Sequence, residues 1–165
     1  MAKEQSFDVV SQVDMQEVDN AVQQTTKELV QRYDLKDTGS TVHLDRSAST
    51  VTLAAPSDFV LGQVKDVLST KLVRRGIDLK ALSWGKTEAA SGGTVRTEAH
   101  VVNGIDAEIA RRINKEIRDE KFKAKVQIEG DKVRVFSPSR DVLQAVIAFL
   151  KSHDYGIPLQ YVNYR

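Results

Sequence analysis

The chain has 165 residues, of which 41% are hydrophobic, a composition typical of a globular protein with a packed core. It contains no cysteine, which excludes disulfides and thiolate metal sites and fits an intracellular location. The formal net charge is +1, and no apolar leader or membrane-length window is present. We therefore expect a cytoplasmic protein that does not use a membrane.

The charge is distributed unevenly along the chain. Residues 1–84 carry 10 Lys and Arg against 12 Asp and Glu, whereas residues 85–165 carry 14 against 11. The second half is therefore the better place for an anionic ligand. It is nevertheless far less basic than a dedicated DNA-packaging protein would be.

The first half predicts a strand, a helix, a hairpin, a second helix and a last strand. Asp14 can cap the first helix, with Glu17 placed three residues later as in a capping box. Ser57 can cap the second helix, and Gly76 can end it. The expected elements are a strand over 6–11, a helix over 15–33, strands around 42–44 and 51–53, a helix over 58–75 and a strand over 79–84.

Residues 85–93, with the sequence GKTEAASGG, have the composition of a linker. After them the same order of elements returns. The expected elements are a strand over 94–102, a helix over 105–117, a hairpin of strands over 124–129 and 132–136, a helix over 139–153 and a strand over 159–163.

The two halves also resemble each other residue by residue. The segment TVTLAAPS at 50–57 returns as KVRVFSPS at 132–139, and the pair Gly76-Ile77 returns as Gly156-Ile157. Each half therefore reads β-α-β-β-α-β, the order of the ferredoxin-like fold with a four-stranded antiparallel sheet and two helices on one face. We predict an α+β protein of two tandem ferredoxin-like, RNP-like domains, residues 1–84 and 94–165, joined by the linker 85–93.

Six motifs spread over the whole chain resemble the YajQ family. These are small bacterial proteins described as nucleotide-binding, and in some members as cyclic di-GMP-binding. The resemblance implies two tandem ribonucleoprotein-like domains, a cytosolic location and no known catalytic activity. The motifs are Ser6-Phe7-Asp8, Arg74-Arg75-Gly76-Ile77, ASGGTVR at 90–96, Gly104-Ile105-Asp106, SRDVLQAVI at 139–147 and Asn163-Tyr164-Arg165.

Polar side chains on the free face of the second predicted sheet form the best candidate site. Arginine suits phosphate because its guanidinium binds in bidentate geometry, lysine provides a point charge, and an aromatic ring can stack on a base. A solvated sheet face with ordinary cross-strand ion pairs explains the same residues without a ligand. The positions are Arg96, Glu98, His100, Lys125, Gln127, Glu129, Lys132, Arg134 and Phe136.

Two groups of basic residues on helices can each be interpreted either as ordinary surface residues or as part of a binding site. Arg74 and Arg75 follow Lys71 at the end of the second helix, where cations complement the helix dipole, but they could also edge a ligand cleft. The helix residues Arg111, Lys115 and Arg118 share one face. This face is either a solubilising surface or a contact for phosphates, and the first interpretation is favoured.

The sequence thus favours a non-enzymatic protein that binds a nucleotide, either a guanine nucleotide such as GTP or cyclic di-GMP, with ATP as a further option. It would act as a sensor or adaptor, without a cofactor or metal, and a protein partner is left open. The alternative is an RNA-binding module that uses the free sheet faces. The expected phosphate ligands are Arg74, Arg75, Arg96, Lys125, Arg134 and Arg165, and the expected base contacts are Phe7, Phe136 or Tyr164.

A phosphoryl-transfer enzyme ranks last among these functions. Such a site needs a phosphate-binding loop after the first strand, and residues 11–14 read SQVD, without glycine or arginine. The third strand of each predicted sheet carries one aromatic residue at most, so RNA readout by stacked rings is not encoded either.

Overall fold

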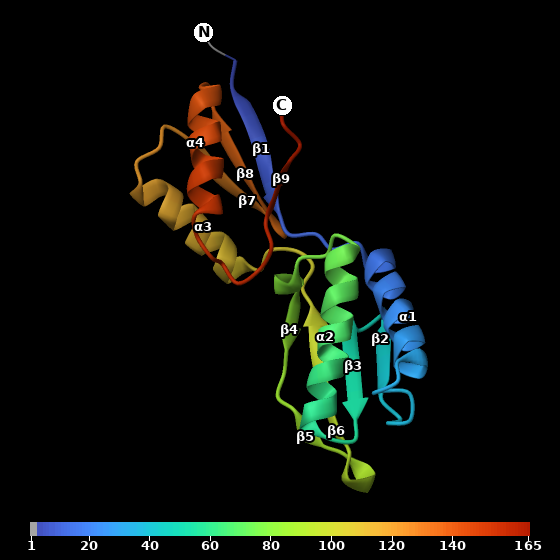
Figure 1. Cartoon of the computed structure of the whole chain (residues 1–165). Coiled ribbons are helices and arrows are strands. Elements are labelled where there is room, and N and C mark those ends of the chain that lie inside the picture. The colour runs from blue at the N-terminus through green and yellow to red at the C-terminus, as the bar shows by residue number, and fades with distance from the viewer. Residues whose placement is uncertain (1–2) are drawn as a thin grey trace. The chain divides into compact units, whose positions relative to one another are not determined.

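The computed structural model describes residues 3–165 and contains two antiparallel sheets and four long helices (Figure 1). The predicted α+β class with ferredoxin-like units is confirmed. No helix among the described residues is long and apolar enough to cross a membrane. The elements are β1 (Gln5–Val10), α1 (Met15–Gln31), β2 (Thr41–Asp45), β3 (Thr50–Ala55), α2 (Asp58–Arg74), β4 (Leu82–Trp84), β5 (Glu88–Ala89), β6 (Val95–Val101), α3 (Ala107–Asp119), β7 (Lys125–Glu129), β8 (Lys132–Ser137), α4 (Arg140–Lys151) and β9 (Gln160–Val162).

The strand order shows that the two halves exchange their first strands. One sheet has the order β7-β8-β1-β9, and the other has the order β2-β3-β6-β4, with β5 paired to β6. The strand β1 therefore completes the sheet of the second half, and β6 completes the sheet of the first half. In each sheet the exchanged strand lies in the middle, so neither sheet is continuous without it.

The predicted domain boundaries are corrected by this exchange. The chain divides into unit 1, which joins the segment ending at Gln12 to Asn103–Arg165, and unit 2, which is Val13–Val102. The division at 84 and 94 is wrong because the alternation of apolar residues shows which face of a strand is buried but not which sheet the strand joins.

Residues 85–93 are part of unit 2 and not a linker. Glu88 and Ala89 pair with Arg96 and Val95, so this segment extends the hairpin between β4 and β6. Its small residues form the turn of that hairpin, where Gly92 has φ +75°. Linker composition and turn composition are alike, which explains the error.

Each unit has its own core between its sheet and its helices. In unit 1, β1 places Phe7 and Val9, both with no exposed surface, against helix residues such as Ile113. In unit 2, Val51 from β3 and Ala99 from β6 occupy the corresponding place. Burial of such side chains stabilises each unit by about 25 cal/mol per Å² of apolar surface removed from water.

The helix ends follow the sequence signals. The side chains of Asp14 and Ser57 cap the N-termini of α1 and α2, as expected, and the side chain of Ser139 caps α4. After α2, Gly76 takes φ +77° and the backbone N–H of Ile77 bonds to the carbonyl of Leu72, which ends the helix in a Schellman motif. Local chemistry therefore determines where the helices begin and end.

The strand exchange can be tested with fragments. We expect a fragment of residues 13–102 to unfold cooperatively in urea, because it contains every strand of its sheet. Fragments 1–84 and 94–165, the predicted domains, should show no cooperative transition by circular dichroism, because each lacks the middle strand of its sheet and the core residues on it. A cooperative transition in either would contradict the strand order.

Candidate functional site

The free face of the unit 1 sheet brings together four residues from four strands or their extensions. Lys125 of β7 lies opposite Phe136 of β8, Phe136 lies opposite Ser6 of β1, and Ser6 exchanges two backbone hydrogen bonds with Arg165 at 3.0 and 3.1 Å. Side chains directly opposite each other on neighbouring strands are close enough to contact a common ligand. We call this line of Lys125, Phe136, Ser6 and Arg165 the cross-strand row.

A β-bulge after β9 brings Arg165 to this row. Two residues, Asn163 and Tyr164, stand opposite the single residue Phe7, and Asn163 has the left-handed φ of +56° that such a bulge needs. The ladder pairs on either side of the bulge are Asp8 with Val162 and Ser6 with Arg165. The bulge therefore returns Arg165 to the free face.

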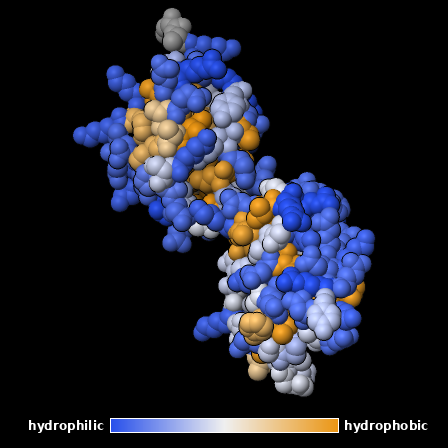
Figure 2. Space-filling view, in the orientation of Figure 1, coloured by the Kyte–Doolittle hydropathy of each residue, from blue (hydrophilic) through white to orange (hydrophobic). Residues whose placement is uncertain are grey.

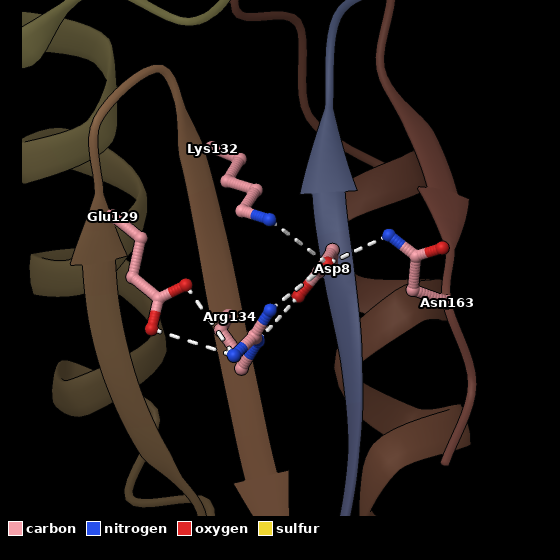
Figure 3. A network of polar contacts seen from close by, with 5 residues as sticks. All are labelled: Asp8, Glu129, Lys132, Arg134 and Asn163. Atoms are coloured by element: carbon pink, nitrogen blue, oxygen red, sulfur yellow. Dashed lines mark hydrogen bonds and ion pairs between the residues drawn. The ribbon is translucent and has the colours of Figure 1, made fainter.

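Next to the cross-strand row, the buried carboxylate of Asp8 organises a polar network (Figure 3). Its side chain is only 1% exposed. Arg134 donates from Nε to Oδ1 at 2.7 Å and from Nη2 to Oδ2 at 3.4 Å, and Asn163 donates to Oδ2 at 2.8 Å. The Nζ atom of Lys132 lies 3.7 Å from Oδ2 of Asp8, and Glu129 accepts a hydrogen bond from Nη1 of Arg134 at 3.4 Å. A buried charge needs such partners, because desolvation without them would be costly.

The network keeps Asp8 ionised. Burial is the largest single influence and by itself raises the pKa of Asp8, but the hydrogen bonds from Arg134 and Asn163 and the charges of Arg134 and Lys132 outweigh it. The pKa of Asp8 therefore lies below its ordinary value of 3.8. The pKa of Arg134 is raised in return, chiefly by its hydrogen bond to Asp8.

The predicted phosphate ligands of unit 1 now divide into two kinds. Arg134 is occupied, since its guanidinium binds the carboxylates of Asp8 and Glu129, so it would have to release a carboxylate to bind a phosphate. Lys125 and Arg165 are exposed, and within residues 3–165 neither side chain has a hydrogen-bond or ion-pair partner. These two cations are therefore the available ones.

The three predicted base contacts have different positions. Phe136 is half-buried in the cross-strand row, with part of its ring open to solvent. Phe7 is fully buried in the core, so its ring offers no face to a ligand, which corrects that prediction. Tyr164 is 60% exposed and lies 6.2 Å from the ring of Phe7, on the helix side of the bulge.

Arg96 belongs to the other unit. It lies on β6, exposed, between Ala54 of β3 and Glu88 of β5. It borders a hollow of about 330 Å³ in which two cations face two carboxylates, a mixed charge that gives an anion little net attraction. The lining residues are Thr50, Ser83, Gly85, Lys86, Glu88, Arg96, Thr97, Glu98 and His100.

Arg74 and Arg75 lie at the end of α2, on the helix layer of unit 2. Arg75 is 3.7 Å from Glu17 of α1, and both arginines border a second hollow between α1 and α2. They are therefore on the opposite side of unit 2 from Arg96. The structure does not bring the six predicted phosphate ligands into one site. Among the described residues, no group of three or more potential ligands could hold a metal ion.

The sequence alone indicated no role for Asp8 and Asn163. Both belong to quoted motifs, Ser6-Phe7-Asp8 and Asn163-Tyr164-Arg165, and the 2.8 Å bond between them shows that these motifs meet in the structure. A carboxylate within the otherwise apolar run Phe7–Val10 was the available signal, since a buried charge requires a partner.

Comparison with known proteins gives a consistent result. The family model described as "Nucleotide-binding protein YajQ-like" matches residues 5–165. A relative from Acidithiobacillus ferrooxidans, named nucleotide-binding protein, is 49% identical over 160 residues, which cover 97% of this chain and 98% of the relative. Relatives of the same name from Alkaliphilus oremlandii and Desulfitobacterium hafniense are each 48% identical over 165 residues, the full length of both chains.

The Asp8 network predicts a pH-dependent loss of stability. We expect Asp8→Asn to lower the free energy of unfolding at pH 7 by about 3 kcal/mol, because Arg134 and Lys132 lose a buried counter-charge. Since the folded-state pKa of Asp8 lies below 3.8, its contribution is full above pH 3.8 and is lost as the pH falls through the folded-state value.

Urea unfolding at several pH values measures this difference. The exposed Asp119, at the end of α3, supplies the control, and Asp119→Asn should change the free energy of unfolding by less than about 0.5 kcal/mol. If the difference in the free energy of unfolding between Asp8→Asn and the unmodified protein stayed constant down to pH 2.5, the charge of Asp8 would contribute nothing to stability.

Proposed function

The chain belongs to the nucleotide-binding protein YajQ-like family, and on this premise we propose that it binds a nucleotide on the free face of the unit 1 sheet. The observation that carries the proposal is the cross-strand row. In it, one partly open ring lies between two cations that have no partner in the part of the chain that the structure describes. A base stacks on Phe136, and Lys125 or Arg165 holds phosphate.

The spacing of the row matches the size of a nucleotide. Neighbouring strands lie about 4.8 Å apart, so Lys125 is one strand from Phe136 and Arg165 is two strands away, at roughly 10 Å. A base centred on the ring thus has a cation within reach on each side. A mononucleotide uses one of them, whereas a ligand with two separate phosphate groups uses both.

We propose a guanine nucleotide or cyclic di-GMP as the ligand. Guanine presents N–H donors on its edge, and Gln127, which follows Lys125 on the exposed face of β7, offers an amide oxygen to accept from them. Cyclic di-GMP carries two phosphates, and the row has two cations. The role is binding without chemical turnover, so that the occupied sheet face serves as a signal to a partner.

RNA binding on the same face is the alternative. A single strand could cross the row with one base on Phe136 and phosphates at Lys125 and Arg165. Its affinity would fall steeply with salt because each phosphate contact releases counterions. Among residues 3–165, Phe136 is the one ring available for stacking on this face, which favours a ligand with one stacked base over an extended strand.

Calorimetry with paired variants tests the site. We expect the double variant Lys125→Ala/Arg165→Ala to weaken binding of cyclic di-GMP or GTP about 100-fold, since two charge-assisted contacts are lost. Its matched control is Arg111→Ala/Lys115→Ala, which removes the same charge from the exposed surface of α3 and should change the dissociation constant less than twofold. If both variant pairs lost affinity equally, the binding would be non-specific charge attraction and the proposed site would be wrong.

The ring has its own test. Phe136→Leu keeps an apolar side chain in the row but removes the stacking surface, so we expect nucleotide binding to weaken roughly 10-fold or more. Thermal unfolding of the variant shows whether the sheet is intact. Undiminished affinity in a folded Phe136→Leu variant would remove Phe136 from the site. A response confined to a short single-stranded RNA, lost between 50 and 200 mM salt, would favour the RNA alternative.

A further inference from the structure

A hollow of about 540 Å³ lies between α1 and α2 on the helix layer of unit 2. A smaller hollow of about 250 Å³ adjoins it, and the two share Glu28, Lys71 and Arg74. We call the larger hollow the helix groove. Its lining consists of charged and amide side chains, with no aromatic or aliphatic residue: Gln24, Lys27, Glu28, Gln31, Lys71, Arg74 and Arg75.

Positive charge is concentrated in the helix groove. Unit 2 as a whole has 11 Lys and Arg against 12 Asp and Glu, a net charge of −1. The groove lining has four cations against the single carboxylate of Glu28, a net charge of +3. Figure 2 shows the surface over α1 as predominantly hydrophilic. The groove therefore attracts anions although the unit around it does not.

The one carboxylate in the groove is already neutralised. Glu28 binds Lys71 at 3.0 Å and Arg32 at 3.5 Å, and the hydrogen bond from Lys71 is the main cause that lowers the pKa of Glu28. Lys71 is held in place by this pair, with 16% of its side chain exposed. An incoming anion therefore meets no unbalanced carboxylate in the lining.

Two cations of the groove are uncommitted. Lys27 of α1 and Arg74 of α2 are exposed, and no described side chain forms a hydrogen bond or ion pair with either. They come from different helices and border the same hollow. Arg75 has only a 3.7 Å contact with Glu17, and Gln24 and Gln31 add amide donors. Phosphate oxygens are bound by such a set of donors.

The fold itself does not require arginines at this place. Unit 1 has the same strand order, but its second helix α4 ends at Lys151, the single basic residue of its last turn. The end of α2 carries Lys71 and Arg74 in its last turn and Arg75 as its C-cap. One cation is enough to complement the helix dipole in unit 1, so the dipole does not by itself account for three at the end of α2.

We propose that the helix groove binds an oligophosphate, either as a free chain or as the phosphate tail of a larger molecule. Lys27 and Arg74 contact the phosphate oxygens from the two helices, and Arg75 with the two glutamines completes the set. The lack of an aromatic or aliphatic lining means that the groove recognises the charge and not an attached base. This site is separate from the cross-strand row, which lies in unit 1.

Inorganic tripolyphosphate, titrated into the full-length protein by calorimetry, is the probe. We expect one saturable site, weakened at least 30-fold by Lys27→Ala/Arg74→Ala and retained by Lys27→Arg/Arg74→Lys. The matched control is Lys36→Ala/Lys86→Ala, exposed lysines of unit 2 outside the groove, which should change the dissociation constant less than twofold. Absence of saturable binding, or equal losses in both alanine pairs, would overturn the proposal.

The same titrations separate this site from the nucleotide site. Lys125→Ala/Arg165→Ala should leave tripolyphosphate binding unchanged, and loss of tripolyphosphate binding there would overturn the assignment to the groove. GTP titrated into that variant then distinguishes the two sources of phosphate. If this variant still binds GTP and an added Arg74→Ala removes that binding, the groove binds the phosphate tail of a nucleotide. If the variant binds tripolyphosphate but not GTP, the groove binds a free phosphate chain.

Discussion

The pairing of β1 with β8 and β9 is the constraint on which unit 1 depends. Three consecutive residues of this strand have separate tasks. Phe7 enters the core, Ser6 continues the cross-strand row, and Asp8 is buried on the free face, where it needs a cation. Arg134 supplies that cation, and this commitment leaves Lys125 and Arg165 as the available cations of the row. A strand from the start of the chain therefore decides which residues of the last third can meet a ligand.

The two units share a strand order but present different surfaces. In unit 1, Phe136 and Ser6 are paired neighbours, whereas their counterparts in unit 2 are Ala54 and Arg96. The free face of unit 2 therefore has no ring at the corresponding position, and its hollow mixes both signs of charge. Two exposed cations of unit 2, Lys27 and Arg74, lie instead between its helices. A duplicated architecture has thus acquired a face suited to a base in one unit and a groove suited to phosphate in the other.

The sequence predicted what local chemistry determines. Apolar periodicity located the four helices and the main strands, and the caps Asp14 and Ser57 marked where two of the helices begin. The cross-strand row was partly predictable, because alternation along β7 and β8 places Lys125 and Phe136 on the free face. The sequence did not predict which strands pair with each other. The apolar pattern of β1 fits either sheet, so neither its exchange with β6 nor the burial of Phe7 could be read from it.

The contact between Asp8 and Arg134 could not be predicted for a related reason. The two residues are 126 positions apart, and only the order of strands brings them together. Arg134 therefore looked as available for phosphate as Lys125 did. The bulge at Asn163 was equally hidden, because it depends on the pairing of the C-terminal residues with β1. In this chain, local pattern gives the elements, and long-range pairing decides which side chains remain available.

The most direct test of the central claim is a nuclear magnetic resonance titration of the ¹⁵N-labelled full-length protein with cyclic di-GMP and with GTP. We predict that the largest amide shift changes fall on Lys125, Phe136, Ser6 and Arg165, four residues far apart in sequence that only the row unites. Shift changes confined to unit 2, with these four amides unmoved at saturating ligand, would contradict the placement of the nucleotide site.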